Sequence, residues 1–329
     1  MVFFGVNYCY YVNMKTPAIH YQRKNPLIKK LIDQRYLLML SIPFVIWLVV
    51  FAYIPLVGWL MAFQDYKPNK GFFGSEWVGL YHFKRMFTDP ILAPKFRQVL
   101  WNTIGMSGLG LLIGFPVPII FAILINELKY LKLKRFVQTI SYLPHFVSWV
   151  IVANIVTAAL SPTNGVINEV LLTLGLIKEP VNFMARQEYF WWIIVFADIW
   201  KEMGWNAIIY IAAIAGIDTQ LYEAAVVDGA NRIQRVWHIT LPGIRATVIT
   251  LFILSIGNII NIGFEKQWLL SNPIVAPVAA VLDKYIIDYG ISNYNFSYGT
   301  ALGIFKSIVS VTLLLLVNRA AKKSETNIF

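Results

Sequence analysis

The sequence has little charge and almost no cysteine. Asp, Glu, Lys and Arg make up 14% of its 329 residues, whereas hydrophobic residues make up 58%. A soluble domain usually carries about 25% charged residues, so this composition excludes an ordinary water-soluble enzyme. The single cysteine, Cys9, excludes a disulfide framework within the chain and a cysteine-rich metal site. The composition is typical of a polytopic membrane protein.

Motifs for enzymatic chemistry are also lacking. No Gly precedes a Lys, which excludes a Walker A phosphate loop. The four His residues are scattered without HExxH spacing, and no acid cluster indicates a metal site. No Ser or Cys nucleophile has a recognisable base beside it. We predict that the chain is not an enzyme and binds no metal or cofactor itself.

Long apolar segments predict an all-α fold with six membrane-spanning helices. A spanning helix needs about 20 largely apolar residues. Two of the six segments carry charge within them, namely Asp198, Lys201 and Glu202 in the fourth and Lys306 in the sixth. The predicted spans are residues 37–63, 99–126, 136–160, 189–217, 246–270 and 299–318. They form one domain over residues 37–320, between an N-terminal segment, 1–36, and a tail, 321–329.

The distribution of Lys and Arg predicts that both termini lie inside. With that orientation the inner segments hold 16 of these residues and the outer segments hold nine. Such an excess on the inner side is what membrane topology requires, so the net charge of +11 needs no nucleic-acid partner. The first 36 residues lack the clean apolar core of a cleavable signal peptide.

Three further segments have apolar residues at helical spacing outside the spans. One lies at about residues 27–35 and predicts an inner interfacial helix before the first span. The other two, residues 77–90 and 278–289, lie on the predicted outer side. They are candidates either for contact with an external protein or for helices that rest on the membrane surface.

The inner segment between spans four and five, residues 218–243, predicts a helix, a break and a second helix. Gly229 permits the positive φ that a sharp turn demands. Apolar residues on both sides of Gly229 give each helix an apolar face, and Pro242 is predicted to end the second helix. Such a unit could insert into a groove on another protein or lie flat on lipid headgroups.

A specific pattern runs through this segment: EAA, three residues, Gly, nine residues, then Ile-x-Leu-Pro. It is filled by Glu223, Ala224, Ala225, Gly229, Ile239, Leu241 and Pro242. The pattern resembles the EAA loop of permease subunits in type I binding-protein-dependent ABC importers. Asp228-Gly229-Ala230, Trp101-Asn102-Thr103 and Ser141-Tyr142-Leu143-Pro144 resemble the carbohydrate-uptake branch. Together they resemble its LplB-type subgroup, which includes importers of alginate and other uronide oligosaccharides, over about residues 30–320.

The resemblance implies a bacterial cytoplasmic (inner) membrane permease with several partners. Residues 218–243 would be a cytoplasmic coupling helix seated on an ATPase, with Glu223 meeting a basic group there and Asp228 among the contacts. Two ATP-binding subunits would bind ATP and Mg²⁺, since this chain has no phosphate loop. A second homologous permease and an extracytoplasmic solute-binding protein would complete the complex in the lipid bilayer. Transport would proceed by alternating access.

Polar and aromatic residues in spans four to six are candidates for the substrate pathway, because polar groups within a membrane tend to face a wet cavity. They are Trp200, Lys201, Glu202, Asn206, Tyr210, Asn258, Asn261, Phe264, Glu265 and Lys306. Other interpretations stay open for several of them. The span-four charges could form a self-satisfying ion cluster, and the two asparagines could join helices by hydrogen bonds. Lys306 could pair with an acid of a neighbouring span or attract a substrate carboxylate.

The predicted substrate is an anionic oligosaccharide of the alginate or pectin type. The basic outer segment 64–98, Lys306 and the LplB-type resemblance favour it. On this basis Lys306→Gln is expected to lower uptake of a uronide oligosaccharide. A neutral sugar remains an alternative. An ion-coupled secondary transporter and a structural or signalling subunit are further alternatives, but the first leaves the EAA pattern unexplained and the second the polar spans.

Overall fold

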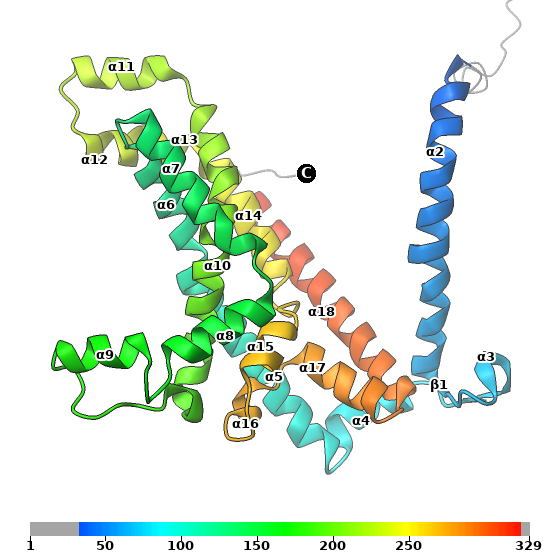
Figure 1. Cartoon of the computed structure of the whole chain (residues 1–329). Helices are drawn as coiled ribbons and strands as arrows, with labels where there is room; N and C mark the ends of the chain where they lie inside the picture. Colours follow the sequence, from blue (N-terminus) through cyan, green and yellow to red (C-terminus); the bar gives the residue numbers. More distant parts are fainter. Residues whose placement is uncertain (1–32, 324–329) are drawn as a thin grey trace, which may run out of the picture. The chain divides into compact units, whose positions relative to one another are not determined.

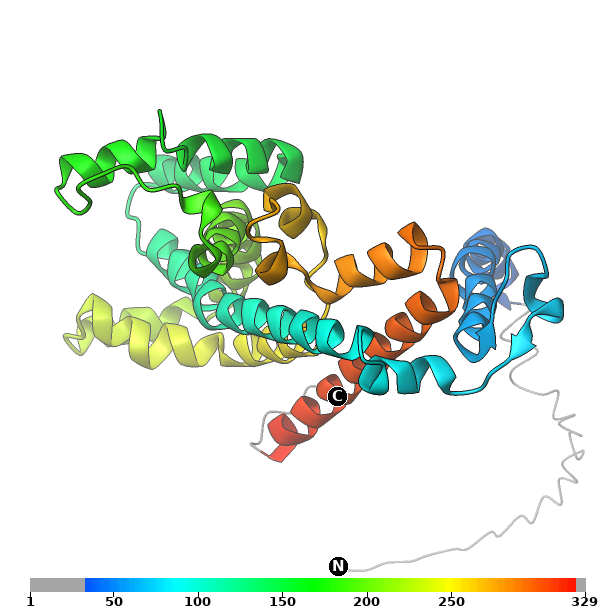
Figure 2. The same cartoon turned by 90° about the horizontal axis from the view of Figure 1, so that it is seen from below.

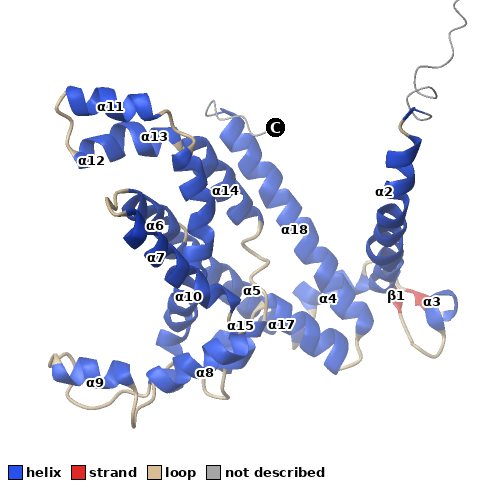
Figure 3. Ribbon diagram, turned by 45° about the horizontal axis from the view of Figure 1, so that its top comes forward, coloured by secondary structure: helices blue, strands red, loops and turns tan. Residues whose placement is uncertain are grey.

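The structure, a computed structural model, describes residues 33–323 (Figure 1). Over these residues it is helical apart from loops and one pair of two-residue strands, β1 (Gln64–Asp65) and β2 (Glu76–Trp77) (Figure 3). The strands are antiparallel, with Gln64 opposite Trp77. The all-α prediction is therefore confirmed for the described residues. The predicted interfacial helix at about 27–35 lies almost wholly outside them.

Most of the described residues belong to helical segments of three kinds: α-helices, segments with π-type bonding and segments with 3₁₀-type bonding. The α-helices are α2 (Arg35–Leu48), α3 (Gly71–Gly74), α4 (Tyr81–Thr88), α5 (Leu92–Leu109), α6 (Pro116–Asn126), α7 (Leu131–Tyr142), α8 (Trp149–Ala159), α9 (Val166–Thr173), α10 (Gln187–Ala215), α11 (Thr219–Val227), α12 (Arg232–Arg235), α13 (Leu241–Gly243), α14 (Arg245–Gly257), α15 (Glu265–Leu270), α16 (Ala276–Ala279), α17 (Leu282–Ile286) and α18 (Phe296–Lys323). Segments with π-type bonding are Val49–Tyr53, Gly110–Gly114, Val236–Thr240 and Ile287–Ser292. Segments with 3₁₀-type bonding are Ile54–Phe63, Leu143–Phe146 and Phe183–Ala185.

The chain divides into two compact units, residues 1–57 and residues 58–329. The described part of the first unit is helical and belongs to the continuous helix Arg35–Phe63. All the packing, cavities and contacts described below lie within the second unit.

Three helices are long and apolar enough to cross a membrane: Arg35–Phe63, Leu92–Asn126 and Phe296–Ala321. Two bent helix pairs could each be a further span. The predicted fourth span corresponds to the 29-residue helix α10, which carries three charged residues near its middle and is not among these five. Six spans with both termini inside stay a prediction.

The predicted third span, 136–160, is not one continuous helix. Its two parts, Leu131–Phe146 and Trp149–Ala159, are bent by 103°. Pro144 lies in the 3₁₀ turn that ends the first part, and Val147 has an extended backbone. The Ser148 hydroxyl then accepts a hydrogen bond from the Ile151 N–H and caps the second part. Pro144 and the Ser148 cap together explain why the chain turns here.

Two other predicted boundaries need correction. The helical part of the predicted span 246–270 ends at Gly257, and the chain runs irregularly past Gly263, whose φ is +72°, before α15 begins. Pro242 does not end the second helix of the 218–243 segment. It lies in α13, the last part of the continuous helical stretch Arg232–Gly243, which runs one residue past it, and the 61° bend comes at Ile244.

Helix α10 is the centre of the second unit. It lies alongside α6 (Figures 1 and 3), and Ala122 of α6 and Ala207 of α10 are both fully buried in one apolar cluster with Tyr210. Small residues at such positions let two helix backbones approach closely. Helix α10 also approaches α7 closely at Gly204, which faces the backbone of Ser141.

The segments predicted as outer helices are helical but shorter than predicted. Residues 77–90 contain α4, and residues 278–289 contain the end of α16, all of α17 and part of the following π turn. Figure 2 shows α4 beside the start of α18. Met86, Phe96, Leu282 and Tyr298 share a buried apolar cluster there, so these helices pack on the start of α18 rather than standing free.

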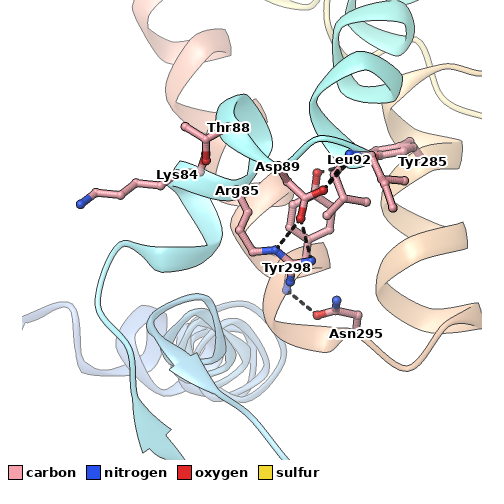
Figure 4. A network of polar contacts seen from close by, with 9 residues as sticks. Lys84, Arg85, Thr88, Asp89, Leu92, Tyr285, Asn295 and Tyr298 are labelled. Atoms are coloured by element: carbon pink, nitrogen blue, oxygen red, sulfur yellow. Dashed lines mark hydrogen bonds and ion pairs between the residues drawn. The ribbon is translucent and has the colours of Figure 1, made fainter.

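Asp89 fixes the corner between α4 and α5 (Figure 4). Its Oδ1 accepts hydrogen bonds of 3.0 Å from the N–H groups of Ile91 and Leu92, and its Oδ2 lies 3.1 Å from Arg85 Nη2. These backbone donors, and then Arg85, hold the pKa of the Asp89 carboxyl below its usual value. The Arg85 guanidinium lies 6.0 Å from the centre of the ring of Tyr298, which is in the first turn of α18.

We expect Asp89→Asn to lower the melting temperature of the purified protein at pH 7, where the carboxylate is ionised. Because the folded-state pKa is depressed, the stabilisation is present above the unfolded-state value of about 3.9 and is lost as pH falls through the lower folded-state value. The melting temperatures of wild type and variant should therefore converge below about pH 4. Thermal unfolding in detergent from pH 7 to pH 3 measures this, with Asp65→Asn, an exposed carboxylate, as control. A constant gap at all pH values would contradict it.

Candidate functional site

The second unit contains a cavity of about 330 Å³ walled by α5, α6, α10, α14 and α15 and the turns between them. Its apolar lining comes from α5, α6 and the π turn between these helices, and equally from α10, α14 and the segment that follows α14. Its polar lining comes mainly from α10, the end of α14 and α15, with one residue from α5. These polar residues are Asp198, Glu202, Asn206, Asn258, Lys266 and Gln267, together with Ser107, Tyr210 and Ser255. A cavity with apolar walls and a few converging polar groups is the usual form of a small-molecule site.

The cavity separates the predicted pathway residues into two groups. Glu202, Asn206, Tyr210 and Asn258 line it. The residues that do not line it are Trp200, Lys201, Asn261, Phe264, Glu265 and Lys306. Trp200, Phe264 and Glu265 are exposed elsewhere on the unit. Asp198 was noted as a charge of the fourth span but was not among the predicted pathway residues, and neither were Lys266 and Gln267, which also line the cavity.

Lys201 holds the bend between α7 and α8. Its side chain is 6% exposed, and its Nζ donates to the His145 carbonyl oxygen at 2.5 Å and lies 3.1 Å from Glu202 Oε1. Glu202 Oε2 in turn lies 2.6 Å from His145 Nδ1, and Trp205 stacks on the imidazole with ring centres 4.2 Å apart. This geometry fits the ion-cluster interpretation for Lys201 and Glu202, although Glu202 also reaches the cavity.

Asp198 belongs to a different pair. Its Oδ1 lies 2.6 Å from Lys266 Nζ, and both residues line the cavity. The Lys266 Nζ is also 5.6 Å from the centre of the Trp149 ring. Spacing along α10 places Asp198 near Lys201, but the folded chain gives it a partner 68 residues away.

The asparagines of the fifth span divide between two roles. The Asn261 amide donates to Ser310 Oγ on α18 at 2.9 Å and so joins the segment after α14 to that helix. The Asn258 amide donates to the Leu254 carbonyl at 3.1 Å, and Asn258 lines the cavity. Asn261 thus has the helix-joining geometry, and Asn258 stays a candidate for binding sugar hydroxyls.

Lys306 is paired outside the cavity. Its Nζ contacts Asp283 of α17, and the second carboxylate oxygen of Asp283 accepts a 3.0 Å hydrogen bond from the Gly263 N–H. The side chains of Lys306 and Asp283 are each 17% exposed. This is the pairing alternative for Lys306, with an acid on a predicted outer helix rather than in a span.

Gln267 gives the cavity an unmet polar atom. The residue is fully buried and lines the cavity, its Oε1 has no hydrogen-bond partner, and its Nε2 contacts only Met106 Sδ at 3.5 Å. A buried acceptor without a donor is costly, so a ligand hydroxyl would improve this site. Within the described part of the chain, no group of three or more His, Cys, Asp or Glu side chains is placed to hold a metal ion.

Residues 218–243, which we call the EAA segment, contain the helices α11 and α12 on either side of Gly229, whose φ is +80°. The Asp218 carboxylate caps α11, and Asn231 and Gln234 form a capping box at α12. The Tyr222 hydroxyl lies 2.9 Å from Thr240 Oγ1 and ties the two arms together. Glu223 and Asp228 are exposed, as are the apolar Val227, Ile233 and Trp237. The predicted coupling residues Ala224, Ala225, Ile239, Leu241 and Pro242 lie in the same two arms.

Comparisons with known proteins agree on one family. The family described as "Binding-protein-dependent transport system inner membrane component" matches residues 114–325. The chain is 45% identical over 302 residues to the polygalacturonan/rhamnogalacturonan transport system permease protein YteP of Bacillus subtilis (strain 168), covering 92% of each chain. It is 44% identical over 289 residues to Protein LplB of the same organism, covering 88% of this chain and 89% of LplB.

Solved structures agree as well. The chain is similar to one chain of a bacterial ABC transporter involved in the import of the acidic polysaccharide alginate, with 38% identity and a TM-score of 0.80 over 90% of this chain and 98% of the other. A second structure is a bacterial alginate ABC transporter in complex with alginate pentasaccharide-bound periplasmic protein, with 38% identity and a TM-score of 0.81 over 92% and 99%. With relatives that are transport permeases rather than enzymes, the chain belongs to the family of inner membrane components of binding-protein-dependent transport systems.

Proposed function

We propose that this chain is the permease subunit of an ATP-driven importer that moves an anionic oligosaccharide into the cytoplasm. The observation that carries the proposal is how the EAA segment connects to the cavity. Helix α10 supplies Asp198, Glu202, Asn206 and Tyr210 to the cavity and ends three residues before α11 begins. At the other end of the segment, α13 leads directly into α14, which precedes Asn258.

This connection suits alternating access. A displacement of α11, α12 and α13 by a partner would be transmitted to α10 and α14, because helices are stiff over their length. Both helices would then move relative to the other elements that line the cavity. The cavity would open and close in step with the partner. Exposed Val227, Ile233 and Trp237 give the segment an apolar surface suited to a groove on that partner.

The partners follow from the same proposal. Two ATP-binding subunits bind ATP and Mg²⁺ and engage this EAA segment and that of a second, homologous permease. A solute-binding protein delivers the sugar from outside, as the periplasmic protein in the alginate transporter complex suggests. Residues 218–243 then lie in the cytoplasm, and six spans with both termini inside complete the topology.

An anionic substrate is supported by the relatives and by the cavity. YteP is described as transporting polygalacturonan or rhamnogalacturonan, and the solved transporter imports alginate; all of these contain uronic acids. The cavity presents one ammonium group, Lys266, together with amide groups that can bind sugar hydroxyls. A neutral oligosaccharide is the second candidate, because Asn206, Asn258 and Gln267 can serve one without any charge.

Two experiments test the proposal in sequence. The tagged protein is extracted in mild detergent, and the proteins that co-purify are identified by mass spectrometry. We expect an ATP-binding subunit and a second permease, and isolation of the chain alone, even after crosslinking at Glu223, would contradict the importer. The reconstituted complex with its binding protein is then assayed for ATPase stimulation. Stimulation by neutral oligosaccharides alone would contradict the anionic substrate.

A further inference from the structure

Of the three lysines in the predicted spans, Lys201, Lys266 and Lys306, Lys266 is the one that lines the cavity. We propose that Lys266 recognises a carboxylate of the transported sugar, and that Asp198 occupies Lys266 in the empty cavity and gives way to that carboxylate. The inference rests on the proposed function, because it assigns the residue that distinguishes an anionic from a neutral substrate. It identifies a positively charged contact in the cavity wall and the counter-ion that neutralises this contact between transport cycles.

Lys201 and Lys306 lack the features that such a role requires. Lys201 is bound by two oxygen atoms, a carbonyl and a carboxylate, and does not line the cavity. Lys306 is paired with Asp283, which is itself anchored by the Gly263 N–H, and also does not line the cavity. Lys266 lines the cavity, and Asp198 Oδ1 is its one hydrogen-bonding partner among the described residues.

The exposure of the two partners favours exchange. The Lys266 side chain is 18% exposed, whereas the Asp198 side chain is 41% exposed. If Lys266 turned to a substrate carboxylate, Asp198 would keep water as its hydrogen-bond partner, so its charge would not be left buried and unpaired. Lys266 would exchange one carboxylate for another and would remain paired throughout. The desolvation cost that locks a fully buried ion pair is therefore small here.

Trp149 fixes the position of the ammonium group during the exchange. Its ring centre is 5.6 Å from Lys266 Nζ and 5.9 Å from Lys201 Nζ, so the indole is within reach of both cations. Trp149 is the first residue of α8, directly after the bend that Lys201 stabilises. Lys201 and Trp149 thus form a rigid support, and Lys266 faces the cavity from it.

The exchange explains why the cavity can hold two carboxylates and still accept an anion. Glu202 is compensated by Lys201 and lies within 2.6 Å of His145 Nδ1, and Asp198 is compensated by Lys266. The empty cavity is therefore close to neutral. A uronide that binds Lys266 adds one negative charge next to a hydrated carboxylate, whereas a neutral sugar gains nothing from displacing Asp198.

The test uses the complete complex, with both ATPases, the second permease and the binding protein, in proteoliposomes. Uptake of trigalacturonate and of its methyl ester is measured for wild type, Lys266→Gln, Lys266→Arg and Asp198→Asn. Lys266→Gln should lower trigalacturonate uptake at least about tenfold, the loss expected for one charge-assisted hydrogen bond. Uptake of the ester by Lys266→Gln should stay within about twofold of wild type, since the ester offers no carboxylate.

The other variants separate recognition of charge from a structural role. Lys266→Arg retains the cation and should keep most of the wild-type trigalacturonate uptake that Lys266→Gln loses. This comparison uses trigalacturonate alone, so it does not depend on delivery of the ester by the binding protein. Asp198→Asn removes the competing carboxylate and should lower the KM for trigalacturonate. Lys284→Gln, which breaks a 2.5 Å pair with Asp288 away from the cavity, is the matched control and should behave as wild type. Co-purification of the partners shows that each variant has folded.

The outcomes also separate this inference from the proposed function. If wild type carries trigalacturonate and Lys266→Gln carries it equally well, the inference is wrong and the proposed function stands. Equal losses in Lys266→Gln, Lys266→Arg and Asp198→Asn would show a structural ion pair and would also overturn the inference. If wild type carries the methyl ester but not trigalacturonate, the anionic substrate itself is wrong.

Discussion

Gly229→Val is expected to reduce oligosaccharide uptake at least tenfold while the chain still inserts into the membrane. Gly229 has a φ of +80°, a conformation that β-branched residues adopt at a cost of about 1–3 kcal/mol. A Cβ at this position would meet no atom within 4 Å, so the effect arises from the backbone alone. The chain would relieve the strain by changing the angle between α11 and α12, which would displace the surface that we assign to the ATPase.

Gly229→Pro should have a similar or larger effect for a second reason. The Gly229 N–H donates to the Val226 carbonyl at 3.1 Å, and the Ala230 N–H donates to the Ala225 carbonyl at 2.8 Å. These two bonds end α11 in the manner of a Schellman turn. Proline removes the first donor and fixes φ near −65°, so the turn cannot form.

Uptake of radiolabelled substrate, membrane insertion by protease accessibility and substrate-stimulated ATPase activity are measured in parallel. Gly175→Val is the matched control, since Gly175 also has a positive φ, +67°, and no atom within 4 Å of an added Cβ, but lies just after α9. It carries the same kind of strain away from the EAA segment. Normal uptake by both Gly229 variants would contradict the coupling role of this segment.

The helices and the turn at Gly229 could be predicted because local sequence determines them. The apolar runs gave the positions of α5 with α6, of α10 and of α18, and the glycine between two short amphipathic stretches gave the break between α11 and α12. These features depend on residues a few positions apart. The bend at Val147–Ser148 could not be predicted, since a single proline in an apolar run is compatible with a mere kink.

The candidate site could be predicted only by residue type. Glu202, Asn206 and Asn258 were recognisable as polar groups in apolar segments, but their partners lie on other helices. Asp198 has Lys201 one turn away, and nothing local indicates that it pairs with Lys266 instead. Lys266 itself stood near the end of a predicted span, where a lysine needs no explanation. Packing of α15 against α8 places Lys266 at the cavity. Sequence spacing carries no information about the contact between these two helices.

Gly204→Ala is expected to be the most destabilising single-methyl change in the second unit. A Cβ on Gly204 would lie 2.1 Å from the Ser141 carbonyl oxygen and 2.5 Å from its carbonyl carbon. Both are backbone atoms, so no side-chain rotation relieves the clash, and α7 and α10 would have to separate by roughly 1 Å. Overpacking of this kind costs about 1–3 kcal/mol, occasionally more.

Separation of α7 from α10 would also break the hydrogen bonds next to Gly204. Two residues on the preceding turn of α10 contact His145: Glu202 Oε2 lies 2.6 Å from its Nδ1, and Lys201 Nζ donates to its carbonyl oxygen at 2.5 Å. A displacement of roughly 1 Å would break both hydrogen bonds. A lower melting temperature and less folded protein after detergent extraction are therefore expected, measured by tryptophan fluorescence and size-exclusion chromatography. Gly108→Ala, at a helical glycine with no atom within 4 Å, is the matched control and should be neutral or stabilising.

A second-site change shows whether backbone contact is the cause. Ser141→Gly removes the Ser141 Cβ, which is also close, at 2.9 Å from the added methyl group, but leaves the carbonyl in place. If the backbone clash dominates, the double variant should remain as unstable as Gly204→Ala. Recovery of the wild-type melting temperature would mean that only the serine side chain obstructs the methyl group. The close approach of α7 to α10 would then not be what positions His145, and the support that we assign to the cavity wall would have to come from α8 and α15 instead.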